Sequence, residues 1–589
     1  MSIGAETKEK SLRRFRLRSI TILAILLMLM GSLVIRALYL QIYDRDFLIS
    51  RGERIHIGSE TIFAHRGSIK DRNGELLAIS SPVDAITVNP RMIVDNMSKI
   101  QELAEVLGID HLALEKKISD GYKSGKQEIN IKKRFSPEKA DQVMALGFPG
   151  VDKRREYDRY YPAGEVTAHL VGLTIRYEDK GIEGLEVKYN DVLKGKSGKK
   201  TFIRDNKKGK RNKVQSIKQL QPPIPGKDII TSIDLRLQYL AYKNLKKAIK
   251  EYNADSGSII ILDAKTNEVL ALVNQPSYNP NDRSQYTPES QRNRAVTDIY
   301  EPGSTIKPLI LTAALESGKY SLASIIDTSP GSIKVGSKKI EDPDNLGLIS
   351  FSTVLTRSSN VGATKIALSL DAEQLWDTLT RFGLGSLTLS NFPAESPGIL
   401  HHHSNWRKVR QATISYGYGL SVTPMQLARA YAVFGAEGIL RPISLLKMDE
   451  PKQGAPVVDS EIAKKISLML EEVVHPGGTG IKARVPSYRI GGKTGTAWRS
   501  KNGNYSKEYI STFVGIAPLN HPRLVVLVKI DKPQGLYYGS DVAAPIFSEV
   551  TSAALRLLGV PPDSLPEESI FTYVESKTLN GNGLRVSKK

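Results

Sequence analysis

The longest apolar stretch of the chain lies close to its first residues. Positions 20–35 are apolar except for Thr21 and Ser32, and the pattern continues past Arg36 to residue 42, which gives 23 residues. As a helix these residues would measure roughly 34 Å, enough to cross the ~30 Å hydrocarbon core of a bilayer. The pattern therefore predicts one membrane-spanning helix.

Lysines and arginines precede this stretch. The positive-inside rule then predicts a cytoplasmic tail at 1–18, a transmembrane anchor at 19–42 and an external remainder. A cleaved signal peptide is the alternative, but it needs a small-x-small site, and none follows residue 35.

A cluster of helix- and strand-breaking residues, QPPIPG at 221–226, divides the rest of the chain. Before it, short strands and basic loops predict an extended α+β pedestal at 43–225, a non-catalytic and dimerisation-like domain. After it, stronger patterns predict a second domain at 226–564. A C-terminal tail at 565–589 completes the predicted organisation.

The second domain shows two hairpins at its two ends. Residues 256–263 and 268–273 form one apolar pair of strands, and 511–516 and 524–530 form another. Helical patterns lie between them, one capped by Asp234 and one opened by a capping box of Thr423 and Gln426. The predicted fold class is α+β, with an antiparallel sheet whose first and last strands meet and whose faces are covered by helices.

Composition and charge narrow the function. The chain is 40% hydrophobic and 25% charged, as in ordinary folded proteins. It has no cysteine, which excludes disulfides, thiolate nucleophiles and cysteine-based zinc sites. The net charge of +21 comes without a nucleic-acid recognition motif, so we expect no nucleic-acid partner. Its basic runs form either a solvated surface or one attracted to anionic lipid or an anionic wall polymer.

Candidate chemistry begins in IYEPGSTIKP at 299–308, where Ser304 and Lys307 are three residues apart. On a helix such residues share a face, so the amine could reach the hydroxyl. A serine is a weak nucleophile until a base takes its proton. A lysine can act as that base only when burial or neighbouring cations lower its pKa.

Two further motifs change the weight of this pair. RSSNVG at 357–362 could point Ser358 and Asn360 into a cleft, and RIGGKTGTA at 489–497 reads as an edge strand that carries a cation. The three motifs follow in order, with Ser358 54 residues after Ser304 and Lys493 135 residues after Ser358. This set is typical of class A β-lactamases and penicillin-binding proteins.

Longer blocks extend the likeness over nearly the whole chain. They are RGSIKDRNGELLA at 66–78, YYPAGEVTAHLVG at 160–172, RNRAVTDIYEPGSTIKP at 292–308, SYGYGLSVTPMQLA at 415–428 and YYGSDVAAPIF at 537–547. The chain resembles a class B penicillin-binding protein, most closely the FtsI-type septal D,D-transpeptidases of bacterial division. The Ser-Ser-Asn middle motif suits these proteins better than the Ser-Asp-Asn of class A β-lactamases.

The resemblance implies acyl transfer at the D-Ala-D-Ala end of a peptidoglycan stem peptide. Ser304 would be the nucleophile, Lys307 the base and Ser358 the proton relay, while Asn360 would hold Lys307 and the substrate amide. The substrate would bind along the strand: its terminal carboxylate on Lys493 and Thr494, and its oxyanion on the backbone N–H groups of Ser304 and Thr496, with Gly495 between them. β-Lactams would acylate Ser304, and neither a metal nor a cofactor is implied.

The same resemblance implies partners and a location. Expected partners are peptidoglycan and lipid-linked wall precursors, the lipid bilayer, a SEDS-type glycosyltransferase and other membrane proteins of the divisome. The expected location is the bacterial inner membrane at the division septum. Alternatives are a transpeptidase of side-wall elongation, a D,D-carboxypeptidase, a β-lactamase, and a non-enzymatic divisome scaffold or penicillin sensor.

Some residues give weaker signals. The neighbours His401, His402 and His403 predict a polar loop rather than a metal site, because three adjacent residues cannot all face one ion. Tyr416 and Tyr418 either line the cleft or pack in the core. Glu165 and Glu183 are expected to be structural contacts of the pedestal.

Overall fold

The computed structural model describes residues 3–94, 97, 100–175, 179–205, 212–501 and 504–564, and the expected tail at 565–589 lies outside them. The chain forms two compact units that interleave along the sequence. Unit 1 comprises Met1–His65, Pro82–Tyr157 and Gly195–Pro225; unit 2 comprises Arg66–Ser81, Asp158–Lys194 and Gly226–Lys589. Two stretches of the expected pedestal therefore cluster with the C-terminal part of the chain.

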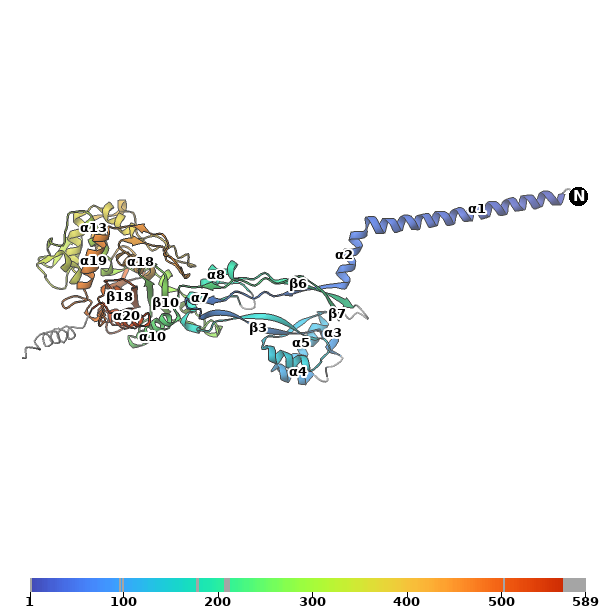
Figure 1. Ribbon diagram of the computed structural model, residues 1–589, viewed down its shortest axis with the longest axis horizontal. Coiled ribbons are helices and arrows are strands. Elements are labelled where there is room, and N and C mark those ends of the chain that lie inside the picture. The colour runs from blue at the N-terminus through green and yellow to red at the C-terminus, as the bar shows by residue number, and fades with distance from the viewer. Residues whose placement is uncertain are drawn as a thin grey trace, which may run out of the picture. The chain divides into compact units, whose positions relative to one another are not determined.

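Unit 1 begins with the apolar helix. α1 (Ile3–Leu38) continues through a π-helical turn at Tyr39–Tyr43, and α2 (Arg45–His56) follows after a bend (Figure 1). Lys10–Tyr43 is long and apolar enough to cross a membrane, and its most apolar window has no protein cover. An apolar helix without cover among the described residues fits a single-pass membrane protein.

The rest of unit 1 combines a ribbon with a small α+β part. The ribbon is an antiparallel sheet of β1 (Ile57–Ile62), β6 (Gly198–Asp205) and β7 (Asn212–Gln221). In the α+β part, β3 (Leu76–Val88) pairs with β4 (Ile129–Phe135) and β5 (Val151–Tyr160), and β3 and β5 each continue into unit 2. Its helices are α3 (Pro90–Ile93), α4 (Ile100–Leu107), α5 (His111–Lys123) and α6 (Pro137–Ala145).

Unit 2 is built on a five-stranded antiparallel sheet of the order β10-β9-β19-β18-β17. The strands are β9 (Ser256–Asp263), β10 (Val269–Gln275), β17 (Gly491–Lys501), β18 (Asn504–Ala517) and β19 (Leu524–Asp531). β9 pairs with β19, with Ile260 opposite Leu527, so the first and last predicted hairpins meet side by side. The predicted antiparallel sheet is confirmed, and β17 lies at its edge.

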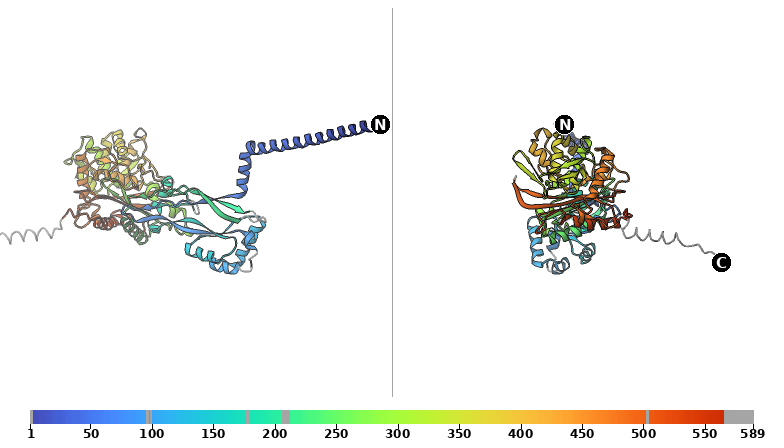
Figure 2. Two further views of the ribbon diagram at one scale, coloured as in Figure 1. Left: turned by 45° about the vertical axis from the view of Figure 1, so that its right-hand side comes forward. Right: turned by 90° about the vertical axis from the view of Figure 1, so that its left-hand side faces the viewer.

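Helices cover both faces of this sheet because its side chains alternate between two cores. Ile260 and Leu527 pack with α13 (Lys307–Glu316), α18 (Pro424–Gly435) and α19 (Ser460–Glu472). Their neighbours Ile259, Ile261 and Val528 face the other way, toward α10 (Leu235–Glu251) and α20 (Ala543–Leu557). Figure 1 shows these two helical layers on opposite sides of β10 and β18, and the right-hand view of Figure 2 shows the strands between them.

Two of these helices begin where the sequence predicts. The Asp234 carboxylate accepts a hydrogen bond from Arg236 N at the start of α10. At α18, Thr423 and Gln426 bond each other's backbone N–H groups, which is a complete capping box. Shorter elements fill the space between the long helices: α11 (Pro288–Gln291), α12 (Arg294–Thr297), β11 (Ile325–Asp327), β12 (Ser332–Val335), β13 (Lys338–Glu341), β14 (Leu348–Ser350), α14 (Phe351–Thr356), α15 (Asn360–Ser369), α16 (Ala372–Arg381), α17 (Lys408–Ile414), β15 (Ile439–Leu440) and β16 (Ala455–Pro456).

The early segments of unit 2 are held by ionic contacts. They form β2 (Ile69–Lys70), β8 (Ile229–Ile230), α7 (Ala168–Val171), α8 (Gly184–Lys188) and α9 (Asn190–Leu193). Glu186 is fully buried and pairs with Arg66 at 2.7 Å and with Arg159 at 2.6 Å. Glu165 accepts hydrogen bonds from Tyr242 and Lys246 of α10, and Glu183 accepts one from Tyr278 at 3.1 Å. Both glutamates thus have structural partners.

Candidate active site

Ser304 lies on a 3-10 turn, Gly303–Ile306, that leads directly into α13. The turn is fixed from two sides: Thr305 Oγ1 donates to Pro302 O at 2.7 Å, and Tyr431 OH donates to Thr305 O at 2.8 Å. Among the described residues, none is hydrogen-bonded to the Ser304 hydroxyl. The half-buried serine therefore has a rigid backbone and a hydroxyl that is available to a substrate.

β17 packs against this turn because a glycine stands at the point of contact. A Cβ on Gly495 would lie 2.8 Å from Thr305 Cγ2 and 3.0 Å from Pro302 O. On the other side, a Cβ on Gly417 would stand 2.0 Å from Gly303 O, and Gly417 has a φ of 87°. Any larger side chain at either position would push the serine turn away from its neighbours.

Lys307 is fully buried at the first position of α13 and points to the middle motif. Its Nζ donates to Ser358 O at 2.5 Å, to Ser358 Oγ at 3.2 Å and to Asn360 Oδ1 at 2.8 Å. Burial, then the charge of Lys493, hold the pKa of Lys307 well below its ordinary value, against an opposing effect of Asp342. The structure therefore unites the first two motifs around an amine that favours its neutral form.

Asp342 fixes the middle motif, and the sequence reading did not identify it. Its carboxylate accepts from Ser359 Oγ at 2.5 Å, from Asn360 N at 2.5 Å and from Val361 N at 3.1 Å, so it caps the N-terminus of α15. Ser358, just before this cap, has a φ of 58°, which is uncommon for a residue with a side chain. Asp342 is 16 residues earlier in the chain, so no local spacing reveals its role.

Lys493 and Thr494 form the third part of the site, together with Thr479. Lys493 is fully buried, and its Nζ donates to Thr494 Oγ1 at 3.2 Å and to Thr479 Oγ1 at 3.4 Å. Burial lowers the pKa of Lys493 to about 7. Thr494 Oγ1 also donates to Thr479 Oγ1 at 3.1 Å. The result is one amine and two hydroxyls, donors suited to a carboxylate.

Thr496 and the following residues define the free edge of β17. Thr496 Oγ1 accepts from Gly539 N at 2.9 Å, which leaves its own backbone N–H for another role. Trp498 N donates to Tyr418 OH at 3.2 Å, away from β18. Because amides of an edge strand alternate in direction and the register from Gly491 to Trp498 is regular, Thr496 N–H points to the same side as that of Trp498. This edge can accept an added strand.

The remaining sequence signals divide between core and surface. Tyr416 packs in a small core with Val335, whereas Tyr418 lies beside β17, so each expected role is met by one tyrosine. The His402 ring lies 4.6 Å from that of Trp376, and His403 packs against the same indole. In the described ranges, no group of three or more His, Cys, Asp or Glu side chains could hold a metal ion.

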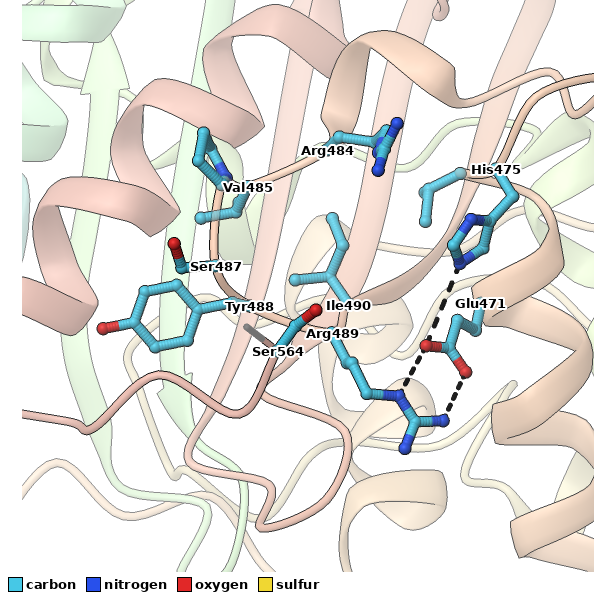
Figure 3. Close-up of a pocket in the computed structure, with 11 residues that line it drawn as sticks. Glu471, His475, Arg484, Val485, Ser487, Tyr488, Arg489, Ile490 and Ser564 are labelled. Carbon is cyan, nitrogen blue, oxygen red and sulfur yellow. Dashed lines mark hydrogen bonds and ion pairs between the residues drawn. The ribbon is translucent and has the colours of Figure 1, made fainter. Parts of the chain in front are cut away.

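A separate hollow of unit 2 holds the last described residues (Figure 3). Arg489 forms a paired ion bridge with Glu471 at 2.6 and 2.7 Å, and Figure 3 shows His475 on the far side of that carboxylate. Arg489 N donates to Asp563 at 2.7 Å, and Ser564 N donates to Ser487 O at 3.1 Å. The predicted catalytic residues do not line it, so we interpret it as a clasp for residues 560–564.

Comparison with known proteins gives two family matches. The model of the penicillin binding protein transpeptidase domain matches residues 257–552, and that of the penicillin-binding protein dimerisation domain matches residues 61–231. The first match contains the three motifs that converge in the structure.

Curated relatives and a solved structure agree with these matches. The chain is 40% identical over 550 residues to the probable peptidoglycan D,D-transpeptidase PbpC of Pseudomonas aeruginosa, covering 93% of this chain and 96% of the relative. It is 38% identical over 559 residues to the peptidoglycan D,D-transpeptidase FtsI of Escherichia coli (strain K12), covering 94% and 93%. The crystal structure of a peptidoglycan synthetase from Bifidobacterium adolescentis shares the fold, with a TM-score of 0.69, 24% identity and coverage of 87% and 98%.

Proposed function

The chain belongs to the family of penicillin-binding protein transpeptidases, and on that premise we propose that Ser304 carries a peptidoglycan D,D-transpeptidase reaction at the division septum. One observation supports this more than any other. The buried Lys307 Nζ contacts Ser358 and Asn360 one turn from the serine, so three motifs distant in sequence form one acid–base unit.

Acylation begins with a proton transfer. Neutral Lys307 takes the Ser304 proton, and Ser304 Oγ attacks the carbonyl carbon of the penultimate D-Ala. The backbone N–H groups of Ser304 and Thr496 stabilise the oxyanion; the loss of one such donor typically costs about 10²–10³ in rate. The terminal carboxylate lies on Lys493 and Thr494.

Collapse of the tetrahedral intermediate breaks the peptide bond. The proton held by Lys307 passes through the Ser358 hydroxyl, 3.2 Å from Nζ, to the leaving amine, and the terminal D-Ala departs. An amine of a neighbouring stem peptide then attacks the acyl-enzyme ester. Its proton returns along the same groups to Ser304 Oγ, and the product is a cross-link with the enzyme restored.

A penicillin tests the nucleophile. We expect the full-length protein in detergent to take up a fluorescent penicillin covalently, and the Ser304→Ala variant to take up none while its thermal unfolding is unchanged. A control variant, Ser317→Ala at the far end of α13, should label like the wild type. Equal labelling of a folded Ser304→Ala protein would refute the proposal.

Product analysis separates the related activities. A transpeptidase yields cross-linked peptide when an acceptor amine is supplied, whereas a D,D-carboxypeptidase yields only trimmed peptide. A β-lactamase would release hydrolysed penicillin quickly, so an acyl-enzyme that persists for many minutes argues against it.

The cellular role concerns an inner-membrane protein with one N-terminal anchor. Its catalytic unit faces the periplasm, and its partners are lipid-linked wall precursors, a SEDS-type glycosyltransferase and other divisome membrane proteins. A fluorescent fusion should gather at midcell; an even side-wall distribution would favour elongation instead. If Ser304→Ala still supported division, the scaffold alternative would replace the enzymatic role.

A further inference from the structure

Glu301, three residues before the nucleophile, has a carboxylate that the chain only partly satisfies. Its Oε1 accepts from Gly419 N at 2.8 Å and from Tyr505 OH at 3.2 Å. Its Oε2 is covered and has no hydrogen-bond partner among the described residues. In the same described ranges, Glu301 forms no ion pair with lysine or arginine. Burial raises its pKa above the ordinary value.

An acceptor that is buried without a partner is costly, commonly by about 1–3 kcal/mol. A structural role alone would be met by an amide or by a paired cation. The free oxygen of Glu301 therefore points to a donor that comes from outside the chain.

Aromatic rings surround this carboxylate. The Tyr418 and Tyr505 rings meet edge to face at 5.6 Å, and those of Trp498 and Tyr505 meet at 5.9 Å. Trp498 and Tyr505 are both about half exposed, at 49% and 47%. Tyr505 is thus a side chain that an incoming donor could displace from Oε1. A carboxylate beside aromatic faces is a setting for an ammonium group.

The edge of β17 leads a substrate to this place. Under the proposed function, the terminal carboxylate lies at Lys493 and Thr494 and the reacting carbonyl at Thr496. The outward amide of Trp498 is already occupied by Tyr418 OH, so an added strand can pair only as far as Thr496. Residues 494 to 498 span about 13 Å at the rise of a strand.

The part of the substrate that leaves the edge is the residue before D-Ala-D-Ala. The Gly417–Gly419 segment holds this point beside the nucleophile, because Gly303 N donates to Gly417 O at 3.2 Å and Gly419 N donates to Glu301. A long side chain on that residue would extend past Thr496 toward Tyr418 and Glu301.

We propose that Glu301, with Tyr418, Trp498 and Tyr505, forms a subsite for the side-chain ammonium of the residue that precedes D-Ala-D-Ala in the donor stem peptide. The inference rests on the proposed function and deepens it, because it names the chemical class of the third residue. The ammonium donates to the Glu301 carboxylate in place of Tyr505 OH and lies against the aromatic rings.

Two donor peptides that end in D-Ala-D-Ala test the subsite. They differ only at the third residue, which is lysine in one and Nε-acetyl-lysine in the other, so length is kept and charge is removed. With the full-length protein in detergent, the wild type should release D-Ala from the lysine peptide with a kcat/KM about tenfold higher. In Glu301→Gln, the ratio between the two peptides should fall to about one.

Glu508→Gln is the matched control, because it removes a carboxylate from the same hairpin outside the subsite, where Glu508 pairs with Arg499 and Lys532. Its peptide ratio should equal that of the wild type. A wild type that does not distinguish the peptides, or a Glu301→Gln protein that keeps the preference, overturns the subsite.

Penicillin uptake keeps this test separate from the proposed function. If Ser304 takes up neither penicillin nor peptide in the wild type, the proposed function fails, whatever the role of Glu301. If Glu301→Gln alone loses penicillin uptake, Trp498→Leu decides in its place, since that side chain is exposed. A peptide ratio that stays at the wild-type value in Trp498→Leu overturns the subsite, and a ratio that falls supports it.

Discussion

Lys307 and Lys493 are both fully buried, and the positive charge of Lys493 helps to hold the pKa of Lys307 below its ordinary value. Two amines in one dry site cannot both stay charged without large cost. Lys307 also feels Asp342, which opposes the effect of Lys493. Division of roles follows: Lys307 favours the neutral form that a base needs, and Lys493 titrates near pH 7, where a bound carboxylate would stabilise its charge.

The first prediction concerns acylation against pH. Because Lys493 has a pKa of about 7, the free enzyme loses this charge as the pH rises above 7, and carboxylate binding should weaken. We expect the second-order rate of penicillin acylation to fall by up to about tenfold between pH 7 and 9. Rapid-mixing measurements with a fluorescent penicillin would show this.

Lys493→Arg provides the contrast, since a guanidinium stays charged throughout that range. The alkaline decline should disappear in this variant, even if its absolute rate is lower. An identical decline in Lys493→Arg would assign the titration to another group.

The second prediction concerns stability against pH. The folded-state pKa of each buried lysine is lowered, so the unfolded chain binds more protons between about pH 7 and 10, and these groups make the folded state more stable as the pH rises through that window. Replacing Lys493 by Met should therefore raise the melting temperature more at pH 6 than at pH 9. Calorimetry at both values would measure the difference.

The corresponding control is Lys482→Met, at a fully exposed lysine that pairs with Asp541. We expect that variant to show no larger gain at low pH. If Lys493→Met gained equally at both values, the burial of Lys493 would not be the cause.

The sequence predicted the antiparallel sheet well because the signals are local. The runs at 256–263 and 524–530 are apolar throughout, which suits strands covered on both faces, and Asp234 and Thr423 mark helix starts by chemistry within four residues. That the two hairpins pair through β9 and β19 followed from a general rule about packing, not from their spacing.

What the sequence could not give is contact between distant segments. Thr479 and Asp342 complete the site from loops far from the three motifs, and Glu301 is recognised only when its neighbours Gly419 and Tyr505 are in place. The interleaving of the two units has the same origin, because segments such as Arg66–Ser81 carry no local mark of the core they join.

The third prediction concerns Asp342, which positions the middle motif. In Asp342→Asn the charge is lost, and an amide can accept at fewer points than a carboxylate, so the cap of α15 is weakened. We expect acylation to fall about 10- to 100-fold and the free energy of unfolding to fall by about 1–3 kcal/mol. Penicillin labelling and denaturant titration measure the two effects.

Asp344→Asn is the control on the same loop. Asp344 is exposed and lies 3.8 Å from Arg357, so its loss should change neither quantity. An Asp342→Asn protein that is destabilised but acylates at the normal rate would limit Asp342 to a structural role.

The fourth prediction concerns the contact between β17 and the serine turn. In Gly495→Ala, the new Cβ would stand 2.8 Å from Thr305 Cγ2 and 3.0 Å from Pro302 O, so the strand and the turn must separate. The amide of Thr496 then moves away from Ser304, and we expect acylation to fall about 10²-fold, as for the loss of one oxyanion donor. The fold should survive, because β17 is an edge strand.

Thr305→Ser removes the methyl group that the new Cβ would meet and keeps the hydroxyl that bonds Pro302 O. Placed on the wild type, it should have little effect; placed on Gly495→Ala, it should restore part of the lost rate. That coupling requires the two side chains to touch in the active form of the enzyme. Additive effects of the two substitutions on the penicillin acylation rate would mean that Gly495 acts on the strand itself and not through its contact with the turn.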